Sequence, residues 1–278
     1  MIRYRTILSS IVLCAFLVAQ TSAGSTAVQK APQHELWIIN TRCAPSCGEQ
    51  QVQQAEIDYQ RFDPKQGWID ADEAAFIDTG SADVPTSLVI HGNQVDSCDA
   101  IREGRYLYRL LCRAAEDRPF RLVVWSWPAT RIRGRIRRDV QIKAAQSDVE
   151  AYYLARSVDR MNADVPLAMM GHSFGARVIT GALHILAGGE LAGRALKDRK
   201  NRPKRAVRVV LIAAALDNGW LLPGWRNGLA LQQVDRMLIT QNSSDRVLRW
   251  YPRLYGRRGP EALGFTGPAC PAQLGENR

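Results

Sequence analysis

The sequence Pro166-Leu-Ala-Met-Met-Gly-His-Ser-Phe-Gly-Ala-Arg-Val178 joins an apolar run to a helix-forming stretch through the pattern Gly-x-Ser-x-Gly. Residues 167–170 predict a buried strand, and a predicted helix begins at Phe174. Ser173 therefore falls in the tight turn between them, where this pattern exposes a nucleophilic hydroxyl. Gly171 and Gly175 leave room there for a strained backbone and for close helix-to-strand packing. A serine that only caps the helix is the alternative.

Short apolar runs alternate with longer helical patterns on both sides of this turn, which is typical of βαβ units. The predicted strands are residues 36–39, 55–62, 87–90, 122–125, 167–170, 207–213 and 237–240. The predicted helices are residues 98–115, 140–162, 174–186 and 229–235. We expect an α/β fold, with a mostly parallel central sheet and helices on both faces.

A second segment, Leu88-Val-Ile-His-Gly-Asn93, predicts a buried strand that ends in His91-Gly92. An acyl-transfer site needs hydrogen-bond donors aimed at the oxyanion that develops during the reaction. The backbone N–H of Phe174 is the first candidate donor, and that of Gly92 or Asn93 is the second. In this interpretation His91 orients the loop instead of accepting a proton.

These two segments, together with residues 242–248 (Asn-Ser-Ser-Asp-Arg-Val-Leu) after a late strand, resemble the α/β-hydrolase superfamily over residues 35–250. The similarity is to exported bacterial lipase- or esterase-like members of uncharacterised activity. It implies a serine hydrolase that acts on carboxylic esters through an acyl-Ser173 intermediate. The superfamily carries its acid after a late strand, so the resemblance implies Asp245, with Asp217 as the alternative acid. Either aspartate could instead be a turn or helix-cap residue.

The histidine that completes the superfamily order of Ser, acid and His does not follow Asp245 in this chain. The four histidines are His34, His91, His172 and His184. We expect the His172 side chain to diverge from that of Ser173, and His184 lies ~16 Å along the predicted helix. His91 is the one geometrically conceivable base. Its alternative role is to orient the oxyanion loop.

Three interpretations of the absent base stay open: a fold kept only for binding, an unorthodox base, or a chain that lacks the last strand and its His turn. The segment after residue 267 favours the third, because its prolines and few apolar residues make a poor strand. We expect weak ester hydrolysis or none, and the competing function is a non-catalytic binding protein on the same fold.

Residues 1–23 have Arg3 and Arg5, an apolar run and then Thr21-Ser-Ala23, which predicts a signal peptide and export to the periplasm or the cell exterior. Residues 24–278 are expected to form a single domain, with a net charge of +8 after the two arginines are removed from the +10 of the full chain. Of the cysteines that remain, Cys43 and Cys47 are spaced for a local disulfide. No group has metal-ligand spacing, and the expected chemistry needs neither a metal nor a cofactor.

The partners follow from charge and composition. We expect a small-molecule or lipid ester as substrate and no nucleic acid, because no nucleic-acid motif is present. Arginines cluster at positions 131, 133, 135, 137 and 138, and residues 194–208 are also basic. Such runs are usually solvated loops, and the alternative is weak contact with acidic polymers or a membrane surface. Tryptophans in residues 125–128 and 220–225 either line an acyl pocket or are ordinary packing residues.

Overall fold

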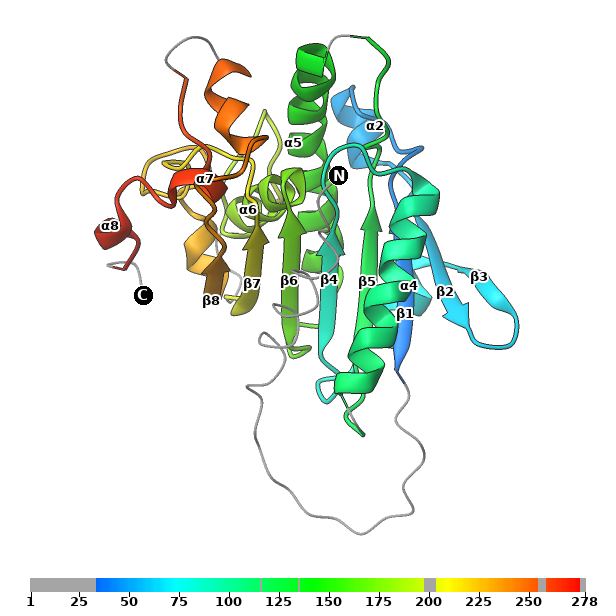
Figure 1. The fold of residues 1–278 in the computed structure, drawn as a ribbon. Helices are drawn as coiled ribbons and strands as arrows, with labels where there is room; N and C mark the ends of the chain where they lie inside the picture. Colours follow the sequence, from blue (N-terminus) through cyan, green and yellow to red (C-terminus); the bar gives the residue numbers. More distant parts are fainter. Residues whose placement is uncertain (1–33, 116, 135, 198–203, 255–258, 276–278) are drawn as a thin grey trace.

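Within residues 34–275, apart from 116, 135, 198–203 and 255–258, the computed structural model contains an eight-stranded sheet of order β3-β2-β1-β5-β4-β6-β7-β8. The strands that run parallel are β1 (Glu35–Asn40), β4 (Thr86–Ile90), β5 (Arg121–Ser126), β6 (Leu167–His172), β7 (Val207–Ile212) and β8 (Val234–Ile239). An antiparallel hairpin of β2 (Asp58–Asp63) and β3 (Gly67–Ala71) extends the sheet beside β1. The predicted mostly parallel α/β architecture is therefore confirmed (Figure 1).

The α-helices are α2 (Glu49–Gln53), α3 (Glu73–Asp78), α4 (Ser97–Ala114), α5 (Ile136–Arg160), α6 (Phe174–Leu186), α7 (Leu263–Thr266) and α8 (Pro271–Gly275). Two 3-10 helices, η2 (Ala230–Gln233) and η3 (Leu248–Leu254), flank β8 along the chain. No helix among the described residues is long and apolar enough to cross a membrane.

The alternation of side chains along the strands determines which helix covers which face. Leu122 and Val124 of β5 pack in one buried cluster with Leu107 and Leu111 of α4. Their neighbours Val123 and Trp125 belong to the other cluster, which α5 and α6 cover. Because successive strand residues point to opposite faces, β5 supplies both cores, and helices lie on both faces as predicted (Figure 1).

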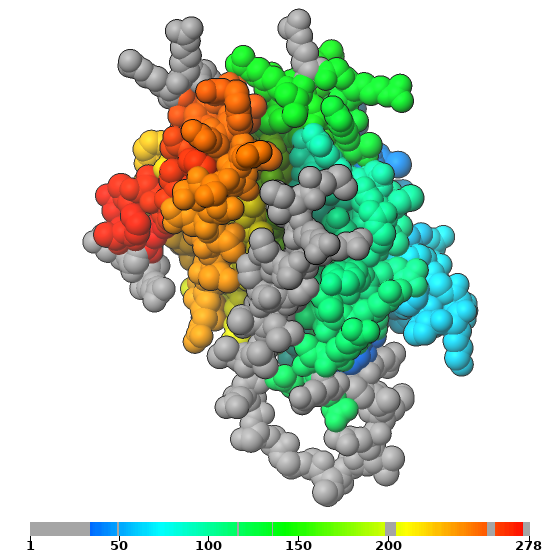
Figure 2. Space-filling model, in the orientation of Figure 1, coloured from blue at the N-terminus to red at the C-terminus, as the bar shows by residue number. Residues whose placement is uncertain are grey.

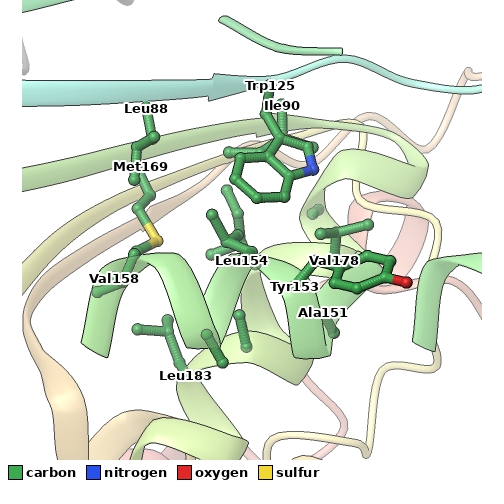
Figure 3. Close-up of a cluster of buried hydrophobic side chains, with 14 of the residues drawn as sticks. Leu88, Ile90, Trp125, Ala151, Tyr153, Leu154, Val158, Met169, Val178 and Leu183 are labelled. Carbon is green, nitrogen blue, oxygen red and sulfur yellow. The ribbon is translucent and has the colours of Figure 1, made fainter. Parts of the chain in front are cut away.

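The larger core lies between the sheet and the pair of helices α5 and α6. Trp125 and Ile90 extend from their strands toward Leu154 of α5, and Val178 of α6 lies beside them (Figure 3). These residues are buried almost completely. This packing holds α6, and therefore the turn that precedes it, firmly against the carboxyl end of the sheet.

Three local predictions are wrong. Residues 229–235 form the 3-10 helix η2 and the beginning of β8 instead of an α-helix, because Val234 already pairs with Val207 of β7. The strand predicted at 55–62 begins at Asp58, where pairing with Asn40 starts, and the sequence did not predict β3 or α3. Cys43 and Cys47 are free thiols, so the local disulfide is absent from the described structure. The predicted signal peptide lies outside the described residues.

The carboxyl ends of the six parallel strands meet at one edge of the sheet, shown at the top of Figure 1. The first turns of α5 and the orange helix η3 stand beyond this edge. The strands β4 and β6 are neighbours in the sheet, although Leu167 lies 77 positions after Ile90 in the sequence. This pairing brings the two segments that the sequence singled out to the same place.

Candidate active site

Ser173 lies between β6 and α6 with a backbone conformation that non-glycine residues rarely adopt. Its φ is 53° and its ψ is −111°. The N–H of Ser173 donates to the carbonyl of Ile212 (2.8 Å), and its own carbonyl accepts from Ala176 and Ala215 (3.2 Å each). A conformation of this kind costs about 1–3 kcal/mol and persists only where its surroundings enforce it. These hydrogen bonds to β7, to the segment after it and to α6 enforce it here.

The two glycines of the turn are required by close contact. A Cβ on Gly175 would lie 2.1 Å from the carbonyl oxygen of Ile90, and one on Gly171 would lie 2.6 Å from the backbone nitrogen of Ala176. Neither distance can accommodate a carbon atom. The glycines thus allow α6 to approach β4 and β6 closely enough to present Ser173 at the edge of the sheet.

Gly92 lies directly beside Ser173. A Cβ on Gly92 would be 3.2 Å from the Cβ of Ser173 and 2.9 Å from Nδ1 of His172. The sequence predicted that these two strand ends converge, and the parallel pairing of β4 with β6 brings them together. The backbone of Gly92 is therefore close enough to Ser173 for a second oxyanion donor to act on the same bound group.

Phe174 is the first residue of α6, and its side chain is buried. The N–H groups of the first turn of a helix have no partner within the helix, and the helix dipole makes that end positive. The N–H of Phe174 begins this turn immediately after Ser173. It is suited to stabilise negative charge on an oxygen of the group whose carbon bonds to the serine oxygen.

His91 is buried, and both of its ring nitrogens are engaged. Nδ1 lies 2.9 Å from the carbonyl oxygen of Gly92, which can only accept, so Nδ1 carries the proton. Nε2 accepts from the backbone N–H of Trp127 and from Arg42, at 3.3 Å each. Burial is the main cause that lowers the pKa of His91 to about 3, so the ring is neutral at pH 7. The arrangement suits a residue that orients the Gly92 loop.

Arg42 and Trp127 support this loop, and the sequence did not reveal either role. Arg42 donates to Ser126 Oγ (2.8 Å), to Thr130 Oγ1 (3.2 Å) and to the carbonyl of Val95 (3.1 Å). Trp127 Nε1 donates to the carbonyl of His91 at 2.9 Å, and the two rings stack with centroids 5.7 Å apart. The partners are 36 to 88 residues apart along the chain, so no local pattern could have indicated them.

Asn93 faces α5. Its Nδ2 donates to Asp139 Oδ2 (2.9 Å), and Asp139 Oδ1 accepts from the N–H of Ile132 (2.9 Å). Asn93 Oδ1 is buried and has no hydrogen-bond partner among the described residues. The side chain of Asn93 thus anchors its loop to the start of α5, while the backbone of the loop stays beside Ser173.

The two candidate acids have different surroundings. Asp245 follows β8, and its Oδ1 accepts from the N–H groups of Val247 (2.8 Å) and Leu248 (3.0 Å), which caps η3. Its charge also acts on His172, whose pKa Asp245 raises while burial lowers it more strongly. Asp217 Oδ1 accepts from the hydroxyl of Tyr251 at 2.6 Å, and its backbone pairs with Ala262. Asp245 is therefore the aspartate whose charge reaches the imidazole next to Ser173.

The other histidines lie away from Ser173. His34 precedes β1 and stacks on Phe120, at the amino edge of the sheet. His184 lies in α6, and its Nδ1 accepts from the N–H of Leu229 at 3.2 Å. All four histidines belong to the described part of the chain, and His91 and His172 are the two at the edge that carries Ser173.

Of the tryptophans in residues 125–128 and 220–225, Trp125, Trp127 and Trp220 are buried and Trp225 is 60% exposed. Trp125 is buried and donates from Nε1 to Glu150 Oε2 at 3.0 Å. Glu150 also accepts from Thr41 Oγ1 at 2.7 Å, and burial raises its pKa to about 7. Trp220 lies under the guanidinium groups of Arg177 and Arg226, 4.5 and 4.9 Å from its ring centroid. These contacts are those of packing residues.

Within the described residues, no group of three or more His, Cys, Asp or Glu side chains is arranged to hold a metal ion. In comparisons with known proteins, neither a family model nor a curated protein matches this chain. The function is therefore inferred from the geometry of the site.

Proposed function

We propose that this chain is a serine hydrolase of the α/β-hydrolase type, which transfers the acyl group of a carboxylic ester to Ser173 and then to water. The observation that carries the proposal is the strained backbone of Ser173, at φ 53° and ψ −111°, between a parallel strand and a helix. Strain of this size is costly, and it clusters where it serves catalysis. A serine that merely capped α6 would not need it.

In the proposed reaction, Ser173 Oγ attacks the acyl carbonyl and the carbonyl oxygen becomes an oxyanion. The backbone N–H of Phe174 and that of Gly92 or Asn93 stabilise this charge. Collapse of the tetrahedral intermediate breaks the ester C–O bond, and the alkoxide leaves as the alcohol with the equivalent of the proton that Ser173 loses. Water then hydrolyses the acyl-Ser173 ester to the carboxylic acid and the free serine. No metal or cofactor enters this chemistry.

We propose Asp245 as the acidic member of the site, because it raises the pKa of His172 beside Ser173. Asp217 is the weaker candidate, because its charge is not among the causes that shift the pKa of His172. No histidine follows Asp245 in the sequence, and both ring nitrogens of His91 are engaged, by Gly92 on one side and by Trp127 and Arg42 on the other. Burial lowers the pKa of His172, which makes that imidazole a weaker base. Proton removal from Ser173 is therefore the weak step. We expect hydrolysis of p-nitrophenyl esters near the uncatalysed rate, and robust hydrolysis that Ser173→Ala abolishes would contradict this expectation.

Covalent labelling tests the nucleophile without requiring turnover. A fluorophosphonate should modify the folded chain at Ser173, as located by mass spectrometry of tryptic peptides, and the reaction should be slow because it also requires removal of the Ser173 proton. Ser173→Ala should abolish the label, and Ser244→Ala, which alters an exposed serine in the turn after β8, should leave it unchanged. Urea should also abolish the label, because unfolding disperses the oxyanion donors.

The second candidate function is a non-catalytic binding protein on the same fold. It is favoured by the engagement of both nitrogens of His91, which leaves that ring no site for the proton of Ser173. The same labelling experiment decides between the two functions. A folded chain that takes up no fluorophosphonate at Ser173 supports binding alone.

We also propose export through residues 1–23, on the sequence pattern of that segment. Cleavage after Ala23 is the expected outcome, and sequencing the amino terminus of the chain purified from an expressing bacterium would test it. Full-length chain recovered from the cytoplasm alone would contradict export.

A further inference from the structure

Two arginine-rich segments lie at the same edge of the sheet as Ser173. Residues 130–138 include the end of the connection from β5 and the first turn of α5, and residues 246–254 include η3 after β8. Neither segment contains an aspartate or glutamate. They contact each other, because a guanidinium nitrogen of Arg137 donates to the carbonyl of Leu254 at 3.4 Å. The two segments therefore form one continuous region, although about a hundred residues separate them along the chain.

We call this region the arginine surface and define it by seven exposed side chains: Arg131, Arg133, Arg137, Arg138, Arg246, Arg249 and Arg253. None of the seven pairs with a carboxylate among the described residues. The nearest acids in the sequence serve the fold instead. Asp139 is buried and bonded to Asn93 and to the N–H of Ile132, and Asp245 caps η3. The positive charge of the surface thus has no described anionic counterpart.

Large apolar side chains emerge among these arginines. The exposed fractions are 65% for Ile136, 71% for Val247 and 58% for Trp250. The guanidinium of Arg253 stacks on Trp250 at 3.7 Å from the ring centroid. These are three of the six exposed large hydrophobic residues in the described structure. In Figure 2 the green start of α5 and the orange segment together form the upper end of the molecule.

We propose that the arginine surface docks this protein on an anionic phospholipid bilayer. Arginines bind the phosphates and other anionic groups of the lipid headgroups, since each basic side chain near such a surface adds to the attraction. Ile136 and Val247 enter the boundary between headgroups and acyl chains, where apolar area is buried, and Trp250 lies at the level that amphipathic rings prefer. A soluble polyanion would use the arginines but would gain nothing from the exposed aliphatic side chains.

Docking in this way would turn the edge that carries Ser173 toward the bilayer. The loop after β5 and the helix after β8 lie on either side of β4, β6 and β7 in the sheet order. Docking does not require the serine to react, so this proposal stands apart from the proposed hydrolase function. The Ser173→Ala variant is therefore the appropriate starting protein, because it cannot alter the lipid through an acyl-Ser173 intermediate.

The test is co-sedimentation with vesicles of phosphatidylcholine, with and without 30% phosphatidylglycerol as a chosen composition (about a third anionic lipid, enough to give a negative surface potential). We expect binding only to the anionic vesicles. Arg131→Gln/Arg133→Gln/Arg138→Gln/Arg246→Gln should weaken this binding at least tenfold. The matched control is Arg109→Gln/Arg113→Gln/Arg118→Gln/Arg236→Gln, which removes the same charge from exposed positions outside the arginine surface. It should bind within about twofold of the starting protein, as screening over ~10 Å predicts for distant charges.

Two further variants keep the result interpretable. Replacing the same four arginines of the surface by lysine retains the charge and should retain binding. Ile136→Ser/Val247→Ser should weaken binding to anionic vesicles while retention on heparin stays unchanged. All variants are compared in the same form of the chain, so differences between them report on the surface. The proposal is overturned if the matched control loses as much vesicle binding as the variant of the arginine surface. It is also overturned if Ile136→Ser/Val247→Ser binds vesicles as well as the starting protein, because that result would assign the surface to soluble polyanions.

Discussion

The strain at Ser173 predicts an unusual effect of glycine on stability. Replacing an alanine by glycine within a regular element normally lowers the free energy of unfolding by about 0.5–1 kcal/mol, because glycine loses more backbone entropy on folding. At Ser173 the opposite should occur. Its φ of 53° and ψ of −111° are enforced by hydrogen bonds to Ile212, Ala176 and Ala215, and any Cβ in that conformation is strained.

The magnitude follows from the two opposing terms. Removing the Cβ should recover about 1–3 kcal/mol of strain and cost about 0.5–1 kcal/mol of backbone entropy, so Ser173→Gly should exceed Ser173→Ala in stability by about 0–2.5 kcal/mol. Both variants lack the hydroxyl, so their difference isolates the Cβ. The corresponding rise in midpoint temperature is about 2–4 °C for each kcal/mol in a chain of this size.

Urea unfolding followed by circular dichroism measures the free energy of unfolding of both variants. The dependence of this free energy on urea concentration should be the same for the two. The control is Ala74→Gly at an exposed position of α3, which should lose about 0.5–1 kcal/mol in the ordinary direction. If Ser173→Gly is less stable than Ser173→Ala by the same amount as the control, the turn stores no strain. The principal support for a nucleophile at Ser173 would then be lost.

Three further predictions concern the surroundings of the turn. Gly175→Ala should lower the free energy of unfolding by about 1–3 kcal/mol or more, because its Cβ would lie 2.1 Å from the carbonyl oxygen of Ile90; a loss below 0.5 kcal/mol in urea unfolding would contradict this. The folded pKa of His91, about 3, is below its unfolded value, so His91 favours folding above pH 6.5 and this contribution is lost as the pH falls. The stability of His91→Gln should therefore decline less than that of the parent chain between pH 6.5 and 4.5, and parallel declines would refute the role of the neutral ring. Glu150 has the opposite sign, because burial raises its folded pKa to about 7 and its contribution is lost as the pH rises from 4.5 through 7. Glu150→Gln should gain stability relative to the parent chain between pH 5 and pH 8 in the same assay, whereas a constant difference would show that Glu150 titrates alike in the folded and unfolded states and that its pKa is not raised.

Much of the fold was readable from local patterns. The helix after Ser173 was predicted with the bounds Phe174 to Leu186 that the structure has, because an apolar strand, a glycine-flanked turn and a double glycine mark its ends. The hairpin of β2 and β3 was missed, although Pro64 and Gly67 are turn residues and Gly67 has a φ of 86°. The short, partly exposed sequence of β3 has too weak an apolar pattern to indicate a strand. The edge strand β8 was predicted three residues late for the same reason.

The candidate site was likewise predictable from the sequence only in part. The sequence by itself determined the turn at Ser173 and the loop at His91-Gly92, because glycine spacing and buried runs are local properties. The tertiary structure decided what surrounds them: the engagement of both nitrogens of His91, the support from Arg42 and the meeting of two arginine-rich segments at one edge. These contacts join residues tens to more than a hundred positions apart. The physical reason is that parallel pairing of strands, and not distance along the chain, determines which strand ends become neighbours.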